Sequence, residues 1–317
     1  MKVIASTGKE DIALVYIVEL EGGKLAECVE SVQPPLSRQD KWVLLVSTMF
    51  GCPVGCAMCD AGGFYQGKAS AVGILDQIDF LVHRRFPDGH VPCKQFKIQF
   101  ARMGEPALNP AVLDVLEALP GRYHAPGLMP SISTVAPAAN GGFFERLQEI
   151  KQAHFSGGHF QFQFSLHATD DRLRDKIIPV RKWSLAEMAA YGERFFAPGD
   201  RKITLNFALA RHTPLEAGVL LEHFSPDKFL VKITPINPTY RAAENGLASH
   251  LDPHAPDRPD EGIEALRRLG YEVIVSIGEV EENQVGSNCG QYLRAHLEAC
   301  NKLDQGYTYP VLEGGTP

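Results

Sequence analysis

The first forty residues hold two β-rich runs of alternating apolar and polar positions, 12–20 and 24–32, joined at the turn Glu21-Gly22-Gly23. Two such runs around a glycine turn predict a β-hairpin. From Trp42 onward, short apolar runs alternate with longer segments of helical periodicity. The short runs predict strands at 42–48, 96–101, 131–135, 160–167, 202–209, 229–236 and 271–277. The longer segments predict helices at 70–86, 110–119, 143–153, 184–196, 214–223, 260–269 and 290–303.

This alternation of strands and helices predicts βαβ units and a parallel sheet. About six repeats favour a partial (β/α)6 barrel over a flat sheet. The expected fold class is therefore α/β, with residues 1–41 as an N-terminal β-meander or hairpin packed on a barrel formed by 42–317. The proline-rich segment 238–260 is predicted to be a long loop that acts as a lid or faces the substrate.

The composition is typical of a folded globular chain. The chain has 317 residues, of which 44% are hydrophobic and 22% charged, so it can bury a sizeable core. No apolar run reaches the ~20 residues that a membrane span needs. The N-terminus also lacks the features of a signal peptide, so we expect a cytoplasmic monomer with no membrane contact. The net charge of −7 does not favour a dedicated nucleic-acid binder.

Three of the seven cysteines lie close together in the sequence. Cys52, Cys56 and Cys59 are spaced C-x3-C-x2-C directly after a predicted strand, where Gly51 and Gly55 permit a tight turn. Three thiolates can bind three irons of a [4Fe–4S] cluster and leave the fourth iron open for another ligand. A structural zinc site or simple buried thiols are the alternatives.

The cysteine spacing resembles that of the radical S-adenosylmethionine (SAM) superfamily. The resemblance implies that Cys52, Cys56 and Cys59 bind a [4Fe–4S] cluster and that SAM binds its open iron. It also implies an electron donor such as flavodoxin or ferredoxin. The superfamily often has an aromatic residue before the third cysteine; here Met58 stands there, and its polarizable side chain can pack beside adenine.

Seven fragments, from about Glu30 to Tyr292, carry a closer resemblance. They are VESV (29–32), VSTMFGCPVGCAMC (46–59), RMGEPALNP (102–110), ISTVAP (132–137), FSLHATDDRLRDKIIPV (164–180), ITPINP (233–238) and NCGQY (288–292). Each lies at or near the end of a predicted strand, where a barrel places its active site. Together they resemble the RlmN/Cfr family, radical SAM methyltransferases that act on an adenine of large-subunit ribosomal RNA.

This resemblance implies which residues contact SAM. Gly104 and Glu105 would meet its amino group, because a carboxylate opposite an ammonium forms a charge-assisted hydrogen bond. Asn237 would bind the ribose or adenine through its paired donor and acceptor. The other predicted contacts are to the nucleoside and carboxylate, with one apolar wall residue: Ser133, Ser165, His167 and the wall residue Leu166.

The resemblance also implies a two-stage reaction at Cys289, which matches the family's methyl-carrying cysteine. One SAM methylates this thiol, and a second SAM supplies the radical that activates the S-methyl group for addition to an aromatic carbon. Such a thiol must be accessible and ionisable; a buried apolar cysteine is the alternative. Glu30 matches the family's glutamate that handles a proton at the nucleobase.

One departure concerns the family's resolving cysteine, which breaks the covalent adduct between protein and substrate. Leu45 stands at the matching position, and leucine can neither take a proton nor form a disulfide. Cys28 lies two residues before Glu30, so both would face the same side of a strand. We hypothesise on this spacing that Cys28 substitutes for the missing thiol, with an idle packed cysteine as the alternative.

Other departures concern the substrate. The family begins with an additional RNA-binding domain for which this chain has no room, and its basic run before the methyl-carrying cysteine is replaced by an acidic one. The acidic residues are Glu279, Glu281 and Glu282. Acidic side chains repel phosphates, so these residues make RNA a less favoured substrate. A basic cluster that could still meet an anion consists of Arg172, Arg174, Lys176, Arg181 and Lys182.

These observations leave three hypotheses. The first is a radical SAM methyltransferase that uses Cys289 to methylate an aromatic carbon of RNA adenine or of a smaller substrate. The second is a radical SAM enzyme that abstracts hydrogen from a metabolite or peptide without methyl transfer. The third is a non-enzymatic metal-binding module.

Overall fold

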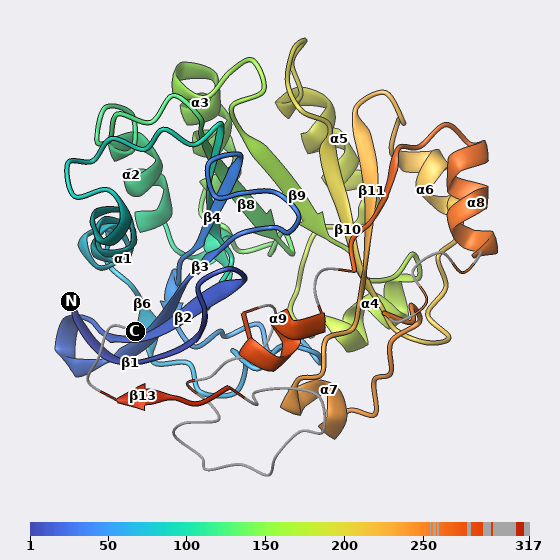
Figure 1. Cartoon of the computed structure of the whole chain (residues 1–317). Helices are drawn as coiled ribbons and strands as arrows, with labels where there is room; N and C mark the ends of the chain where they lie inside the picture. The colour runs from blue at the N-terminus through green and yellow to red at the C-terminus, as the bar shows by residue number, and fades with distance from the viewer. Residues whose placement is uncertain are drawn as a thin grey trace.

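The computed structural model describes residues 1–253, 255, 258, 260–277, 280–287, 293 and 309–313. Within them, eleven strands form one sheet in the order β12-β11-β10-β9-β8-β7-β4-β3-β2-β1-β13 (Figure 1). The parallel strands are β4 (Lys41–Leu45), β7 (Gln95–Phe100), β8 (Leu128–Thr134), β9 (Gln161–Ser165), β10 (Ile203–Leu209), β11 (Phe229–Pro235) and the short β12 (Val273–Val275). This is the expected α/β fold with a curved, open sheet.

The N-terminal strands extend the same sheet rather than forming a separate layer. They are antiparallel to their neighbours: β3 (Leu25–Ser31), β2 (Ala13–Glu19), β1 (Lys2–Lys9) and β13 (Leu312–Glu313). The predicted hairpin corresponds to β2 and β3, and its turn is a short 3-10 helix, η1 (Glu21–Gly23). The strand β1 was not predicted. A separate pair, β5 (Met49–Phe50) and β6 (Gly67–Lys68), encloses the segment that contains the cysteine triad.

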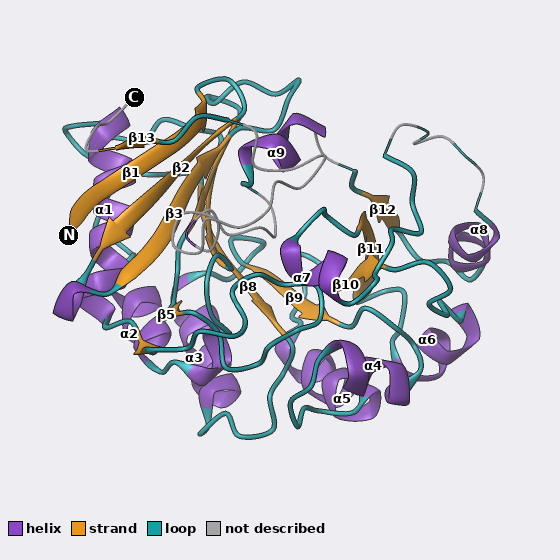
Figure 2. Ribbon diagram, turned by 90° about the horizontal axis from the view of Figure 1, so that it is seen from below, coloured by secondary structure: helices purple, strands orange, loops and turns teal. Residues whose placement is uncertain are grey.

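Six helices surround the outer side of the sheet (Figure 2). They are α1 (Ala71–Arg85), α2 (Ala111–Ala118), α3 (Phe143–His154), α5 (Leu185–Phe195), α6 (Ala217–His223) and α8 (Glu261–Arg268). All six were predicted from their apolar periodicity. The unpredicted helices are α4 (Asp171–Ile177), α7 (Tyr240–Glu244), α9 (Val280–Val285) and the 3-10 helix η2 (Pro106–Leu108). Most of the predicted helix 290–303 lies outside the described residues.

Residues that begin these helices satisfy the first backbone N–H groups, which have no partner inside a helix. The Ser70 side chain accepts from the backbone N–H of Gly73 at the start of α1. Ser184 and Glu187 form a reciprocal capping box at the start of α5. These caps explain why α1 and α5 begin within a residue of their predicted starts.

The two faces of β4 show how the sheet positions the site. Trp42 and Leu44 are fully buried on the side of the outer helices, where Trp42 contacts the ring of Phe86. Lys41, Val43 and Leu45 face the opposite side and line an interior cavity. Since side chains alternate along a strand, the inner face of this sheet is available for binding and chemistry.

Candidate active site

The cysteine triad lies in the loop between β5 and β6, beyond the carboxyl end of β4. Cys52, Cys56 and Cys59 are free thiols and partly exposed, and the N–H of Cys59 donates to the carbonyl of Cys56 at 3.1 Å. Gly51 has φ +77°, and a Cβ there would lie 2.8 Å from the carbonyl oxygen of Phe64. The turn that starts the loop therefore requires glycine.

The triad is suited to bind an iron–sulfur cluster. Burial, followed by the neighbouring Cys59 and Cys52, raises the pKa of the Cys56 thiol. Burial raises the pKa of Cys52 to about 11, although backbone N–H groups of Val54, Gly55 and Glu105 donate to its sulfur and lower it. These N–H groups would stabilise a thiolate that binds iron.

A single metal ion is a poorer fit for the same residues. In the described part of the chain, no three His, Cys, Asp or Glu side chains converge closely enough to bind one ion. A [4Fe–4S] cube instead takes its three thiolates on three different irons, so the sulfurs stand further apart. The three described thiols match the number that a [4Fe–4S] cluster takes when one of its irons is left open.

The helix α7 holds the triad loop in place. Side chains on and beside this helix donate to four loop carbonyls: Arg241 to Cys56 (3.2 Å) and Gly55 (3.2 Å), Asn245 to Ala57 (3.0 Å), and Thr239 to Met58 (2.8 Å). In return, the Asp60 carboxylate accepts from the backbone N–H groups of Tyr240 and Arg241. The segment 238–260 was predicted to be a lid or a substrate-facing loop, but its first part supports the cluster loop.

Met58 lies in a small apolar cluster beside the triad. It is 6% exposed and packs with residues from the carboxyl ends of four neighbouring parallel strands. These are Val135 after β8, Ala168 after β9, Ala208 and Ala210 at the end of β10, and Ile236 after β11. Cys52 and Cys56 pack against the same cluster, so an apolar surface adjoins the triad where we expect adenine to bind.

Gly104 and Glu105 lie directly beside the triad. Gly104 has φ +103°, and a Cβ there would lie 2.6 Å from the Met49 Cγ, so a larger residue does not fit. The Glu105 carboxylate accepts from the Thr134 hydroxyl (2.5 Å) and from the N–H groups of Val135 (2.9 Å) and Ala107 (3.0 Å). Burial raises the pKa of Glu105 to about 7, and the three donors fix its orientation.

The remaining predicted SAM contacts occupy the ends of β8, β9 and β11. The Ser133 and Ser165 hydroxyl oxygens lie 3.3 Å apart on adjacent strands, and both side chains are partly exposed on the inner face. Leu166 is fully buried in the main core rather than in the apolar cluster around Met58. Asn237 is partly exposed two residues after β11, and its carbonyl accepts from the N–H of Thr239 at 2.9 Å.

His167 follows β9 in a left-handed conformation, with φ +63°. Its Nδ1 accepts the N–H of Ala208 at 3.0 Å. Burial, followed by the charge of Arg174, lowers the pKa of His167 to about 4. The ring is therefore neutral at pH 7 and carries its proton on Nε2, which is a donor for a nearby ligand.

Glu30 and Cys28 lie on the outer face of β3, whereas the roles expected of them need the side of the cavity that Leu45 lines. Register pairs Glu30 with Leu44, so both side chains face the outer helices. The Glu30 carboxylate accepts from Arg85 (2.8 Å), Tyr16 (3.2 Å) and Trp42 (3.3 Å).

Cys28 shares the outer face with Glu30, as its spacing predicted, and it is fully buried there. Burial, followed by the charges of Glu27 and Glu30, raises the pKa of its thiol well above the usual range. Because side chains alternate along β3, Cys28 and Glu30 both face away from the cavity. Cys28 therefore does not lie where a substitute for the resolving thiol is needed.

Cys289 lies outside the described residues, but both flanks of its segment are described. Arg102 donates to the carbonyls of Ser287 (3.1 Å) and Gly286 (2.9 Å) on one side. Glu27, which forms a fully buried ion pair with Arg102, accepts from the backbone N–H of Leu293 on the other side. One ion pair therefore anchors the chain before and after Cys289.

Sequence reasoning missed Glu27 and Arg102. The available signal was a carboxylate inside the apolar strand 24–32 and a cation directly after the strand 96–101. Buried charges are rarely unpaired, so the two could have been matched.

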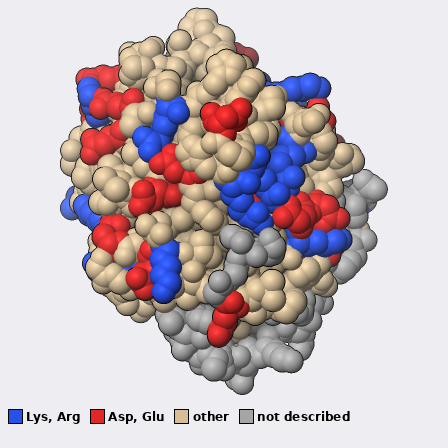
Figure 3. All heavy atoms as spheres, turned by 60° about the vertical axis from the view of Figure 1, so that its left-hand side comes forward, with Lys and Arg blue, Asp and Glu red and all other residues tan. Residues whose placement is uncertain are grey.

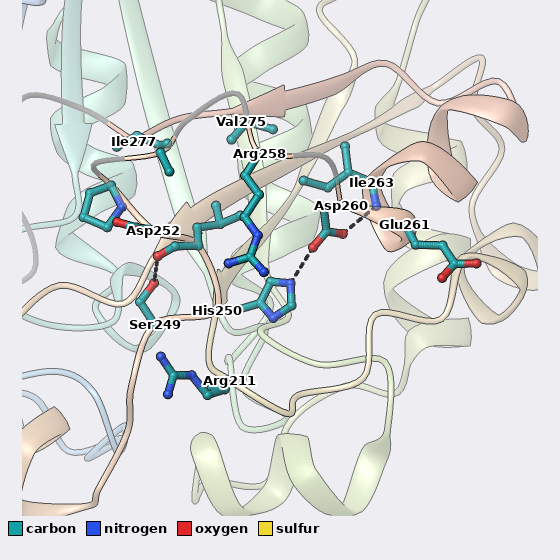
Figure 4. A pocket seen from close by; sticks show the side chains of 13 residues that line it. Arg211, Ser249, His250, Asp252, Arg258, Asp260, Glu261, Ile263, Val275 and Ile277 are labelled. Carbon is teal, nitrogen blue, oxygen red and sulfur yellow. Dashed lines mark hydrogen bonds and ion pairs between the residues drawn. The ribbon is translucent and has the colours of Figure 1, made fainter.

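Two cavities bear on the choice of a substrate site. One of about 420 Å³ is lined by inner-face residues of β4, β7 and β11, and also by Ser287, two residues before Cys289. A larger one of about 570 Å³ lies near α8, where His250 bonds to Asp260 at 2.5 Å and Arg258 extends toward the ring (Figure 4). No triad cysteine lines either cavity, but only the smaller one is lined by Ser287 and by Leu45, which stands at the position of the family's resolving cysteine. The cavity beside Ser287 is therefore the candidate substrate site.

The curved α/β sheet and the three-cysteine loop define a radical SAM enzyme, and the comparisons agree. A radical SAM methyltransferase from Sphaerobacter thermophilus has the same fold, with a TM-score of 0.67 over 87% of this chain and 78% of its own, at 20% identity. SAM-bound SuiB from Streptococcus suis is less similar, with a TM-score of 0.50 over 74% of this chain and 49% of its own, at 14% identity.

Sequence comparison identifies the family. The chain is 30% identical to the probable dual-specificity RNA methyltransferase RlmN of Desulfitobacterium hafniense, over 90% of this chain and 77% of the relative. It is 28% identical to the corresponding protein of Thermus thermophilus, over 89% and 74%. No family model matches the chain. The chain belongs to the RlmN family of radical SAM methyltransferases and is a methylating enzyme that uses a [4Fe–4S] cluster and SAM. A non-enzymatic metal-binding module is thereby excluded.

Proposed function

We propose that this enzyme carries the transferred methyl group on Cys289 and delivers it to an aromatic carbon of a substrate bound in the 420 Å³ cavity. The observation that carries the proposal is the double anchor around Cys289. Arg102 and Glu27 hold its two flanks, and Ser287 lines the cavity. Cys289 follows Ser287 by two residues in the sequence, which supports a role for it at this cavity.

The triad and its neighbours would hold the cluster and SAM. Cys52, Cys56 and Cys59 supply the three thiolates, and the reduced cluster, when bound, supplies the electron that cleaves SAM. The oriented Glu105 carboxylate lies beside Cys52, where the SAM amino group would meet it. The apolar cluster around Met58 would pack against adenine.

Polar groups on the inner face would complete the SAM site. The hydroxyls of Ser133 and Ser165 can each donate to a carboxylate oxygen or accept from a ribose hydroxyl. Neutral His167 can donate from Nε2 without adding a positive charge next to the sulfonium of SAM. Asn237 lies two residues from Thr239, which touches Met58, so its amide would be near the nucleoside.

The second half of the reaction differs from the family pattern. Leu45 lines the cavity at the position of the resolving cysteine, and Cys28 faces the other side of the sheet. Among the described cysteines, Cys93 is buried just before the amino end of β7, far along the strand from the triad. We therefore infer that release of the methylated product does not use a thiol from the described residues.

RNA is one possible substrate, because the curated relatives are named RNA methyltransferases. The surface gives it limited support. Acidic and basic side chains are interspersed over much of the face in Figure 3, with one compact basic patch. Within the predicted basic cluster, Arg174 pairs with Asp171 (2.9 Å) and Lys182 with Asp175 (2.6 Å).

We propose reduction by a flavodoxin or ferredoxin, and a monomer in the cytoplasm. No helix among the described residues is long and apolar enough to cross a membrane.

The test begins with anaerobic reconstitution of the cluster, followed by reduction in the presence of SAM. We expect 5′-deoxyadenosine, and peptide mass spectrometry should show one methyl group on Cys289. The Cys300→Ala variant is the matched control and should keep the methyl group, whereas Cys289→Ala should lose it. If 5′-deoxyadenosine forms while Cys289 stays unmethylated, the enzyme instead abstracts hydrogen without methyl transfer.

A further inference from the structure

The cavity beside Ser287 lies between the two ends of the curved parallel sheet. Side chains from β4 and β7 form one wall, and residues of β11 and β12 form the other. Its volume of about 420 Å³ falls within the range of small-molecule sites and suits a ligand of mononucleotide size.

Three lysines project into this cavity: Lys41 from β4, Lys97 from β7 and Lys232 from β11. Register pairs Val43 with Lys97, which places Lys97 on the same inner face as Lys41 and Val43. The Lys41 ammonium donates to the Gln33 amide oxygen at 2.5 Å. One carboxylate, Glu282, lines the cavity as well, so three cations and one anion leave an excess of positive charge on the inner face of the sheet.

Lys97 gives the strongest indication of an anion-binding site. It is 7% exposed, and its ammonium has no hydrogen-bond acceptor among the described residues. Burial, followed by Lys232, Lys41 and Arg201, lowers its pKa well below the usual range. The charged groups that act on it are all cations, and an uncompensated buried ammonium is costly. A bound anion would remove that cost.

The position of the lysines relative to the chemistry indicates how a ligand would lie. Lys41 begins β4 and Leu45 ends it, and four residues of strand span ~13 Å. Leu45 lines the cavity at the carboxyl end of β4, and Ser287, two residues before Cys289 in the sequence, lines it as well. A ligand held by its anion at Lys41 and Lys97 would extend its other end toward Leu45.

We propose that the cavity binds the substrate through a phosphate or carboxylate held by Lys97 and Lys41, so that the substrate is a small anionic molecule of mononucleotide size. This inference rests on the proposed function for the direction of the reacting end. An RNA strand is a poorer fit, because one of its phosphates would have to reach Lys97, which is only 7% exposed, rather than lie along the surface.

The experiment measures binding by calorimetry to the cluster-loaded enzyme. The probes are inorganic phosphate, adenosine 5′-monophosphate, adenosine and a short RNA oligonucleotide. We expect the monophosphate to bind and adenosine to bind at least about tenfold more weakly, since adenosine lacks the charge-assisted contact. Lys97→Met should weaken phosphate and monophosphate binding about tenfold, and Lys41→Met should act in the same direction.

Lys97→Met replaces a buried cation with an apolar side chain of similar length, so the variant should fold at least as stably as the parent. Lys2→Gln, at an exposed position on β1, is the matched charge control and should leave binding unchanged. Equal phosphate binding by the parent and Lys97→Met overturns the inference. So does oligonucleotide binding that Lys97→Met leaves intact while neither phosphate nor the monophosphate binds.

Methylation of Cys289 is measured on the same samples, which separates the two proposals. Lys97-dependent anion binding with an unmethylated Cys289 rejects the proposed function and keeps the anion site. A methylated Cys289 with no Lys97-dependent anion binding keeps the proposed function and rejects the anion site.

Discussion

Glu27 and Arg102 are both fully buried and form an ion pair across β3 and the segment after β7. Glu27→Gln leaves the Arg102 charge without its carboxylate, so we expect the free energy of unfolding to fall by about 3–5 kcal/mol. Urea unfolding measures this change. The double variant Glu27→Gln/Arg102→Met removes both charges and should recover much of the loss.

Methylation of Cys289 should not recover in the same double variant. The carbonyls of Gly286 and Ser287 and the N–H of Leu293 would have lost their charged anchors. Peptide mass spectrometry distinguishes a positioning role from a structural one, because stability and methylation then change independently. Full methylation in the stable double variant would contradict the positioning role.

His167 gives a second prediction at the residue scale. Its pKa is about 4 in the folded protein against an ordinary value of 6.5. Between these values the unfolded chain binds a proton that the folded chain does not, so stability falls as pH falls from 6.5 to 4. Below pH 4 both states are protonated and the effect is complete. This pKa difference corresponds to a loss of about 3 kcal/mol in the free energy of unfolding.

His167→Asn should abolish this part of the pH dependence, and asparagine tolerates the left-handed backbone at this position. Urea unfolding of the cluster-free protein across this range is the measurement, since acid loss of the cluster then makes no contribution. His159→Asn, at an exposed position, is the control and should retain the parent's profile. An unchanged profile in His167→Asn would show that other groups dominate the acid response.

The positions of Glu30 and Cys28 show what single-strand reasoning can predict. Alternation correctly placed both side chains on one face of β3. It could not say which face, because that depends on the register between Val29 and Leu45 on the next strand. Register is a long-range property that a period-two pattern leaves open.

At the scale of elements, the long helices could be predicted from local patterns, whereas the short helix α7 could not. The six outer helices each bury an apolar face, so their periodicity was readable. Helix α7 has five residues, too few to show a period, and only Ala242 is buried in it. Its role comes from side chains that reach the triad loop, which lies about 180 residues earlier in the chain.

Arg241→Met tests that role of α7. It removes the donor to the carbonyls of Cys56 and Gly55 while keeping an apolar side chain of similar reach. We expect lower iron and sulfide content after reconstitution and a several-fold faster loss of the cluster's visible absorption, because the loop opens more easily. Arg267→Met on α8 removes only an exposed pair with Glu264 and should behave like the parent.

At the scale of the whole molecule, the curl of the sheet brings Leu45 on β4 and Ser287 beyond α9 to one cavity. The motifs predicted the strand ends and the triad, but they carried no information about which distant side chains meet across the interior. The lysine-lined cavity and the anchors around Cys289 both arise from that curl.

Leu45→Cys tests the arrangement directly. A thiol at this position would face the cavity that Ser287 also lines, two residues from Cys289. Mild oxidation of the cluster-free, unmethylated variant should therefore join the introduced thiol to Cys289 in an intramolecular disulfide, which peptide mapping detects. Lys2→Cys on the exposed edge of β1 is the matched control and should form no such bond. Failure of Leu45→Cys to crosslink, with both thiols titratable, would separate Cys289 from the cavity and remove the geometric basis for methyl delivery there.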